Sequence, residues 1–132
     1  MVTWCRSRWQ RVSKRRELTI LERAIPKGRP RFTKSGHVYT PPTTRAWEDR
    51  IAWAWRSAYP GEEPFDGPVE VHMLFKGKRR LPGDLSNYVK AAEDALNGLA
   101  WVDDRQIVES HAFKLTGSWD LVWIIVTERR EP

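Results

Sequence analysis

Residues 69–98 read VEVHMLFKGKRRLPGDLSNYVKAAEDALNG, and two hydrophobic periodicities follow one another within this segment. Residues 69–76 alternate apolar and polar side chains, which predicts a strand with one buried face. Residues 84–97 instead place apolar side chains three and four positions apart, which predicts a helix. The dipeptide Asn97-Gly98 supplies the left-handed residue that commonly ends a helix. A strand, a basic loop and a helix are therefore expected in this order.

The flanking sequence adds a strand and a helix before this segment and two strands after it. The expected elements are a strand at 17–25, a helix from Thr43 or Thr44 to about Tyr59, and strands at 107–115 and 119–127. The turn Thr116-Gly117-Ser118 between the last two strands is typical of a β-hairpin. The resulting order, β-α-β-α-β-β, predicts an α+β domain with two helices on a mostly antiparallel four-stranded sheet.

Length and composition indicate one globular domain, because 40% of the 132 residues are hydrophobic and 30% are charged. The net charge of +6 arises in residues 1–16, where six basic side chains are accompanied by no acidic one. We expect residues 1–16 to form a disordered basic arm and residues 17–132 to form the folded domain. Upstream sequence included with the chain, or a targeting peptide, are the alternatives for this arm.

Metal-ligand chemistry is also limited by composition. The chain has one cysteine and three histidines scattered singly along it, so thiolate or imidazole ligand sets are not expected. Any metal should therefore be bound by oxygen ligands, which indicates magnesium or manganese. No apolar run approaches the length of a bilayer span and no signal peptide is evident, so we expect a cytoplasmic protein with no membrane partner.

Acidic residues gather at two points around the predicted helix. Asp84 lies at its start, Lys90 and Asp94 follow on one polar flank, and Asp103-Asp104 precede the next strand. Carboxylates that are brought together repel one another, and a divalent cation relieves that repulsion. Structural explanations also exist: Asp84 as a helix cap, Asp103-Asp104 as a solvated turn, and Lys90 with Asp94 as a helical ion pair. Spacing alone favours these structural explanations.

The same residues resemble the signature of the RusA family of Holliday junction resolvases. Residues 84–106 are similar to its D-x-D-N-x-x-K start, its D-A-L and its D-D-x-Q-[IV], and residues 25–32 and 39–41 resemble its basic N-terminal loop. The resemblance spans about residues 17–128. It implies a magnesium-dependent endonuclease, with manganese as a substitute, that resolves four-way DNA junctions by paired symmetric nicks. It further implies a homodimer acting in DNA recombination and repair, in a bacterial or phage-infected cell.

The resemblance also implies roles for single residues. Asp84 and Asp104 correspond to magnesium ligands and Lys90 to the catalytic lysine. Ser86 stands where the family has a second acid, so one carboxylate of the family's set is missing. Glu93 is a candidate replacement, although two helical turns, about 10 Å of rise, separate it from Ser86. The further candidate metal ligands are Asp103, Ser86 and Glu93.

Basic side chains around this region are expected to contact DNA phosphates. The candidates are Lys27, Arg29, Arg31 and Lys34 in the first loop, Lys76, Lys78, Arg79 and Arg80 in the second, and Lys114 downstream. For Lys114, an ordinary position on a strand surface is an equal interpretation. The alternative functions are a less selective nuclease for branched DNA, a junction-binding protein whose catalysis is weakened by Ser86, and a basic RNA-binding or ribosomal module.

Overall fold

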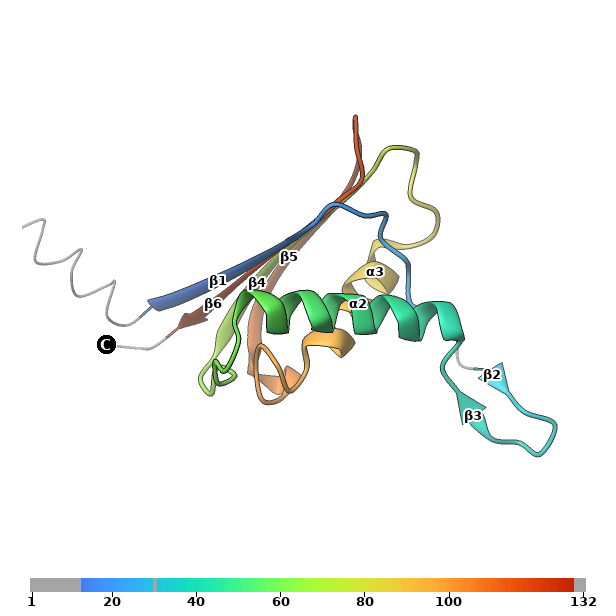
Figure 1. The fold of residues 1–132 in the computed structure, drawn as a ribbon, viewed down its shortest axis with the longest axis horizontal. Coiled ribbons are helices and arrows are strands. Elements are labelled where there is room, and N and C mark those ends of the chain that lie inside the picture. The colour runs from blue at the N-terminus through green and yellow to red at the C-terminus, as the bar shows by residue number, and fades with distance from the viewer. Residues whose placement is uncertain (1–12, 30, 130–132) are drawn as a thin grey trace, which may run out of the picture.

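The computed structural model describes residues 13–29 and 31–129, which form a four-stranded sheet, two α-helices and a small hairpin (Figure 1). The sheet contains β1 (Ser13–Ile20), β4 (Val69–Gly77), β5 (Ile107–Thr116) and β6 (Leu121–Arg129). The helices are α2 (Pro42–Ala58) and α3 (Leu85–Leu96), and the hairpin joins β2 (Arg31–Phe32) to β3 (Val38–Tyr39). No helix among the described residues is long and apolar enough to cross a bilayer.

The sheet is mixed, with the strand order β1-β6-β4-β5. Strand β6 runs antiparallel to both of its neighbours, whereas β4 and β5 are parallel. The α+β class with two helices is confirmed, but the sheet is mixed where we expected a mostly antiparallel one. The reason is the α3 connection: a helix that crosses over between two neighbouring strands returns the chain to its starting end, so the second strand runs parallel to the first.

The expected hairpin between the last two strands is wrong, because β4 lies between β5 and β6. The turn after β5 passes over the end of β4, where the Gly117 amide donates to the Gly77 carbonyl over 3.0 Å. Gly117 lies so close to Lys76 that an added Cβ would be 2.6 Å from the lysine Cδ. Glycine is therefore needed in this turn because the backbone passes close to Lys76 at the end of β4, and not because the turn is a tight hairpin.

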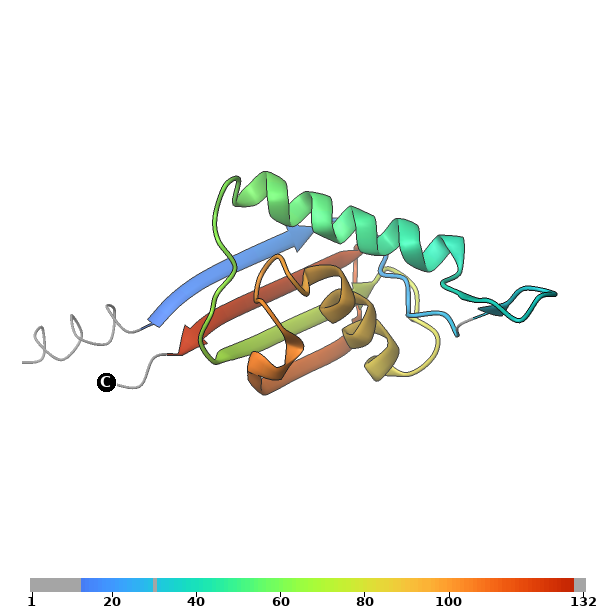
Figure 2. The ribbon, with the colours of Figure 1, turned by 90° about the horizontal axis from the view of Figure 1, so that it is seen from below.

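Both helices cover the same face of the sheet and enclose the core (Figures 1 and 2). Strand β4 alternates strictly, with every odd-numbered residue from Val69 to Gly77 buried against the helices. Trp47 and Trp55 of α2 are 3% and 2% exposed, so both belong to the core. The other face of the sheet stays open within the described chain. Large apolar side chains exposed on or beside it are Phe113, Leu115, Trp119 and Trp123.

The first strand begins at Ser13, which places residues 13–16 inside the sheet and not in the arm to which we assigned them. Eight consecutive residues of β1 pair with β6, starting with Ser13 opposite Arg129. Arg16 donates to the Glu63 carbonyl over 2.9 Å, and its guanidinium lies 4.2 Å from the Phe65 ring centroid. Residues 1–12 of the expected arm lie outside the described residues.

Helix α2 begins at Pro42, slightly before the threonines that we expected to cap it. Pro41 occupies the cap position and no side chain caps the helix. The buried Thr44 hydroxyl instead accepts a 3.0 Å hydrogen bond from the Gly28 amide. Thr44 therefore fixes the basic loop against α2, a contact between distant segments that helix-start rules cannot reveal.

Candidate active site

Asp84 occupies the N-cap position of α3, but its side chain makes no capping hydrogen bond. Its exposed carboxylate stands at the N-terminal end of the helix, where the backbone dipole favours negative charge. Gly83 precedes it with φ +81°, a conformation that glycine adopts without strain. The capping explanation for Asp84 therefore leaves its carboxylate unaccounted for, and the group is available to a ligand.

Two side chains hold the backbone just before Asp84. The buried Tyr88 hydroxyl donates to the Pro82 carbonyl over 2.5 Å, and burial raises the pKa of Tyr88, with Arg23 opposing the shift. Lys114 of β5 donates a hydrogen bond from its ammonium to the Gly83 carbonyl. These two contacts fix the backbone at the N-terminal end of α3, one from the core and one from the sheet. Lys114 thus has a partner inside the protein, whereas its expected contact with DNA stays a prediction.

Asp104 is oriented by a buried tryptophan. The Trp101 indole is fully buried, and its Nε1 donates to Asp104 Oδ1 over 2.7 Å. This hydrogen bond directs the half-buried carboxylate and leaves its second oxygen for another partner. A tryptophan three residues before an acid was the only signal of this contact in the sequence.

Asp103 has a different part from its neighbour. Its carboxylate accepts from the Arg105 amide over 2.9 Å and caps the single 3₁₀ turn Asp104–Gln106, reciprocally with the side chain of Gln106. The hydrogen bond from the Arg105 backbone is the main cause of the lowered pKa of Asp103. Gln106 in turn donates to the Phe65 and Gly67 carbonyls over 2.7 and 2.8 Å. Asp103 therefore stabilises the turn that presents Asp104.

Glu93 is half-buried on α3 and interacts unfavourably with Asp104. Burial raises the pKa of Glu93, the charge of Asp104 raises it further, and Lys90 opposes the shift. Lys90 also forms the expected helical ion pair with Asp94, over 3.2 Å. Two carboxylates that repel each other in a partly buried position form an oxygen donor set that fits a hard divalent cation such as Mg²⁺.

The candidate ligands do not form a closed shell in the described residues. Asp84, Asp104 and Glu93 do not belong to any group of three ligand atoms that lie within 4.8 Å of one another. Ser86 is exposed in the first turn of α3, and Asp84 is not among the charges that shift the pKa of Glu93. Within the described residues, Glu93 therefore interacts electrostatically with Asp104, and no such interaction with Asp84 contributes to its raised pKa.

We expect Glu93→Gln to raise the melting temperature of the metal-free protein at neutral pH. Because the folded state raises the pKa of Glu93, ionised Glu93 destabilises the fold at pH values above that pKa. This gain in melting temperature should vanish as the pH falls below about 4.5, because the Glu93 carboxyl of the parent is then protonated in both the folded and the unfolded state. Thermal unfolding of the parent and the variant in a chelator, across this pH range, measures the difference. The exposed Asp49→Asn on α2 is the control. A lower melting temperature at neutral pH would contradict the prediction.

The basic side chains fall into two groups. Lys27 lies between Glu48 and Asp94, at 2.8 and 2.9 Å, so it links α2 to α3. Burial acts to lower the pKa of Lys27, but hydrogen bonds to these two carboxylates outweigh it and the pKa is raised. A DNA contact by Lys27 would compete with both partners. The side chains exposed to solvent are those of Arg29, Lys34, Lys78, Arg79 and Arg80.

The second basic loop is held in place by contacts of its own. Arg23 donates to the Arg79 and Arg80 carbonyls over 3.0 and 2.9 Å, which turns the loop backbone inward. The ammonium of Lys76 lies 3.9 Å from the Trp119 ring centroid on the open face of the sheet. Arg31 belongs to β2, at the base of the first loop.

Asp84, Glu93 and Asp104 together form what we call the acidic centre. The fold and this centre define a small α+β protein with a candidate site for a divalent cation. A family model described as endodeoxyribonuclease RusA matches residues 23–126, so the chain belongs to the RusA family. Membership implies a nuclease that acts on DNA junctions, of the Holliday junction type. No curated protein sequence matches the chain significantly.

Proposed function

We propose that this protein is a magnesium-dependent endonuclease that resolves four-way DNA junctions by paired symmetric nicks, with manganese able to replace magnesium. The observation that carries the proposal is the presentation of two acids beside a lysine-bearing helix. Asp84 keeps its carboxylate out of the helix cap, and Asp104 is oriented by Trp101. The family of the chain supports the substrate class.

The residues of the site would have two roles, cation binding and stabilisation of charge on the phosphate. Asp84 and Asp104 would hold the cation, with Glu93 as a further donor toward Asp104. A bound magnesium ion supplies Lewis acidity at the phosphate and lowers the pKa of the attacking water. Lys90 is exposed, and its partner Asp94 is also paired with Lys27, so the Lys90 ammonium could leave Asp94 for a scissile phosphate and stabilise the charge that develops there.

Paired nicking calls for two such sites related by a two-fold axis, and one chain provides a single acidic centre. We therefore propose a homodimer. The open face of the sheet is the surface proposed for the second copy, because its exposed aromatic and aliphatic side chains include Phe113, 57% exposed, and Trp119, 55% exposed. This face lies opposite the helices, so a dimer formed through it would leave both acidic centres accessible to DNA (Figure 2).

We expect the double substitution Arg29→Ala with Arg31→Ala to weaken junction binding and to flatten its salt dependence. Each lost phosphate contact should reduce the log–log slope by about one unit. Binding measured over a range of salt concentrations tests this. Arg56→Ala is the matched control, because Arg56 is exposed in the last turn of α2, at the end remote from the hairpin (Figure 1). An unchanged slope in the double variant would mean that the loop does not contact phosphates.

The function itself is tested with the purified protein and synthetic DNA. Four-way junctions, flaps and linear duplexes are incubated with and without magnesium, and the nicked strands are mapped. We expect symmetric nicks in the junction that require the metal. Equal cleavage of flaps and junctions would favour a less selective branched-DNA nuclease. Tight junction binding without cleavage at any magnesium concentration would favour a junction-binding protein whose catalysis was lost because Ser86 replaces the family's second acid.

A further inference from the structure

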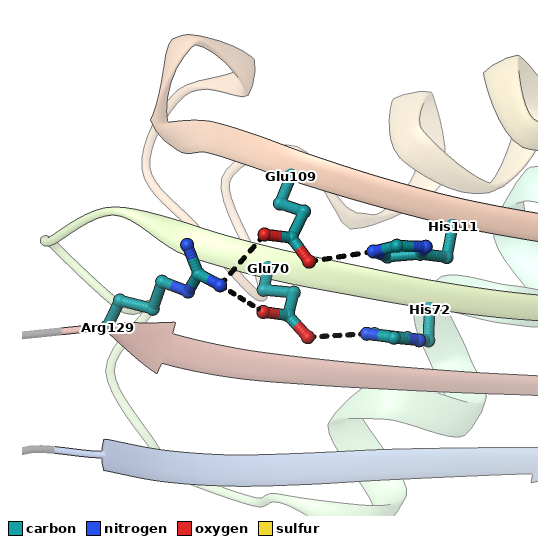
Figure 3. A network of polar contacts seen from close by, with 5 residues as sticks. All are labelled: Glu70, His72, Glu109, His111 and Arg129. Carbon is teal, nitrogen blue, oxygen red and sulfur yellow. Dashed lines mark hydrogen bonds and ion pairs between the residues drawn. The ribbon is translucent and has the colours of Figure 1, made fainter.

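A three-residue pattern, glutamate-x-histidine, occurs once in β4 and once in β5. It comprises Glu70 and His72 in the first strand, and Glu109 and His111 in the second. The parallel register aligns Glu70 with Glu109 and His72 with His111. Even-numbered residues of β4 point away from the buried face, so all four side chains lie together on the open face of the sheet (Figure 3).

The two imidazoles are stacked, with ring centroids 4.5 Å apart and planes inclined by 17°. His72 Nε2 lies 2.5 Å from Glu70 Oε2, and His111 Nε2 lies 2.7 Å from Glu109 Oε2. Both rings therefore direct the same nitrogen toward the carboxylate pair (Figure 3). Ligand atoms of His72, Glu109 and His111 all lie within 4.8 Å of one another. Among the described residues, no other three histidine, cysteine or acidic side chains meet this condition.

Arg129 fixes the carboxylates from the other side. Its Nη2 donates to Glu70 Oε1 over 2.7 Å and to Glu109 Oε1 over 2.8 Å. The hydrogen bond from His111 and the charge of Arg129 lower the pKa of Glu109. Each glutamate thus keeps one oxygen on the arginine and turns the other toward an imidazole. Outer contacts of this kind commonly orient metal ligands.

Charge also favours a cation at this place. One arginine faces two carboxylates, so the cluster retains a negative charge while its imidazoles are neutral. In the single chain these side chains are accessible, since those of His72 and His111 are 40% and 44% exposed, and in a dimer formed through the open face they would lie at the interface between the two copies. Two imidazole nitrogens with a carboxylate oxygen form a ligand set that suits zinc, which binds such donors at about 2.0–2.2 Å.

We propose that His72, His111 and Glu109 form a zinc site on the open face of the sheet, with Glu70 as the adjacent carboxylate. Zinc would take the place of the Nε2 proton that links each imidazole to its glutamate, and that proton would move through solvent to Nδ1, so that each ring stays neutral. The ion would join the edge strand β5 to β4. This site is separate from the acidic centre on the helical face and does not depend on the nuclease activity. It also revises our expectation that singly scattered histidines exclude an imidazole site.

Zinc binding to the metal-free protein tests the proposal, by equilibrium dialysis in excess magnesium, which occupies the acidic centre. We expect one zinc ion per chain, and X-ray absorption at the zinc edge should show two imidazole ligands. The double variant His72→Gln with His111→Gln should bind zinc at least about tenfold more weakly. His37→Gln is the matched control, because His37 is exposed in the β2–β3 hairpin away from the cluster, and it should bind like the parent.

Two further variants separate the possible causes of a loss. Glu109→Gln keeps both imidazoles and should also weaken zinc binding, so it serves if the double variant fails to fold. Asp104→Asn should keep full zinc binding, which distinguishes this site from the acidic centre. Parent-like zinc binding by the double variant, or an absorption spectrum without imidazole ligands, would overturn the proposal.

Discussion

Asp84→Asn and Asp104→Asn are each expected to abolish nicking of a four-way junction while leaving junction binding intact. Each substitution removes one negative charge from the proposed cation site but leaves the basic loops untouched. The carboxamide introduced by Asp104→Asn could still accept from the Trp101 indole, so the orientation of the side chain is preserved. We expect the nicking rate to fall by about 100-fold or more. Single-turnover cleavage and junction binding measured on the same preparations test this.

The adjacent Asp103→Asn is the matched control for this pair. The carboxamide that it introduces could still accept the hydrogen bond from the Arg105 amide, because an asparagine side chain also caps helical turns. Nicking should therefore persist near the parental rate. If Asp103→Asn removed activity and Asp104→Asn did not, the two neighbouring acids would have the reverse roles. If both Asp84→Asn and Asp104→Asn cleaved like the parent, the assigned site would be wrong.

The second large effect concerns Ser86 and Glu93. Ser86→Asp should restore a carboxylate near Asp84 and lower the magnesium concentration needed for half-maximal nicking. Glu93→Gln should have the opposite effect and cripple nicking at low magnesium, because Glu93 and Asp104 share a partly buried position. Magnesium titrations of the two single variants give both effects. At saturating metal the gain from Ser86→Asp should shrink, since an added carboxylate also repels the scissile phosphate.

The double variant decides whether Glu93 replaces the missing acid. If it does, Glu93→Gln should be tolerated once residue 86 is aspartate, and the two free-energy changes should not add. If the two free-energy changes simply add, positions 86 and 93 act independently, as expected if Glu93 interacts with Asp104 and not with residue 86. A harmless Glu93→Gln in the natural background would end the replacement idea. Glu93→Gln would then stabilise the metal-free fold without affecting nicking.

The elements themselves could be predicted from local sequence. Alternation in β4 and the three-four spacing in α3 reflect which face of each element is buried, and Gly98, with φ +84°, ends α3 as expected. The acids and the lysine of the candidate site were found in the same way, because they lie within one continuous stretch that resembles a family signature. Boundaries were less secure: β1 begins four residues earlier than we placed it, because it pairs with β6 along its length.

Contacts between distant segments were decided only by the tertiary structure. The order of the strands places β4 between β5 and β6, and this order replaced the expected hairpin. The same arrangement brings Glu93 toward Asp104 and sets His72 beside His111, although 39 positions separate the two histidines in the chain. Hydrophobic periodicity reports which face of an element is buried, but it carries no information about which strand becomes its neighbour or in what register. That choice depends on how the helices cross the sheet, and it determines which polar side chains meet.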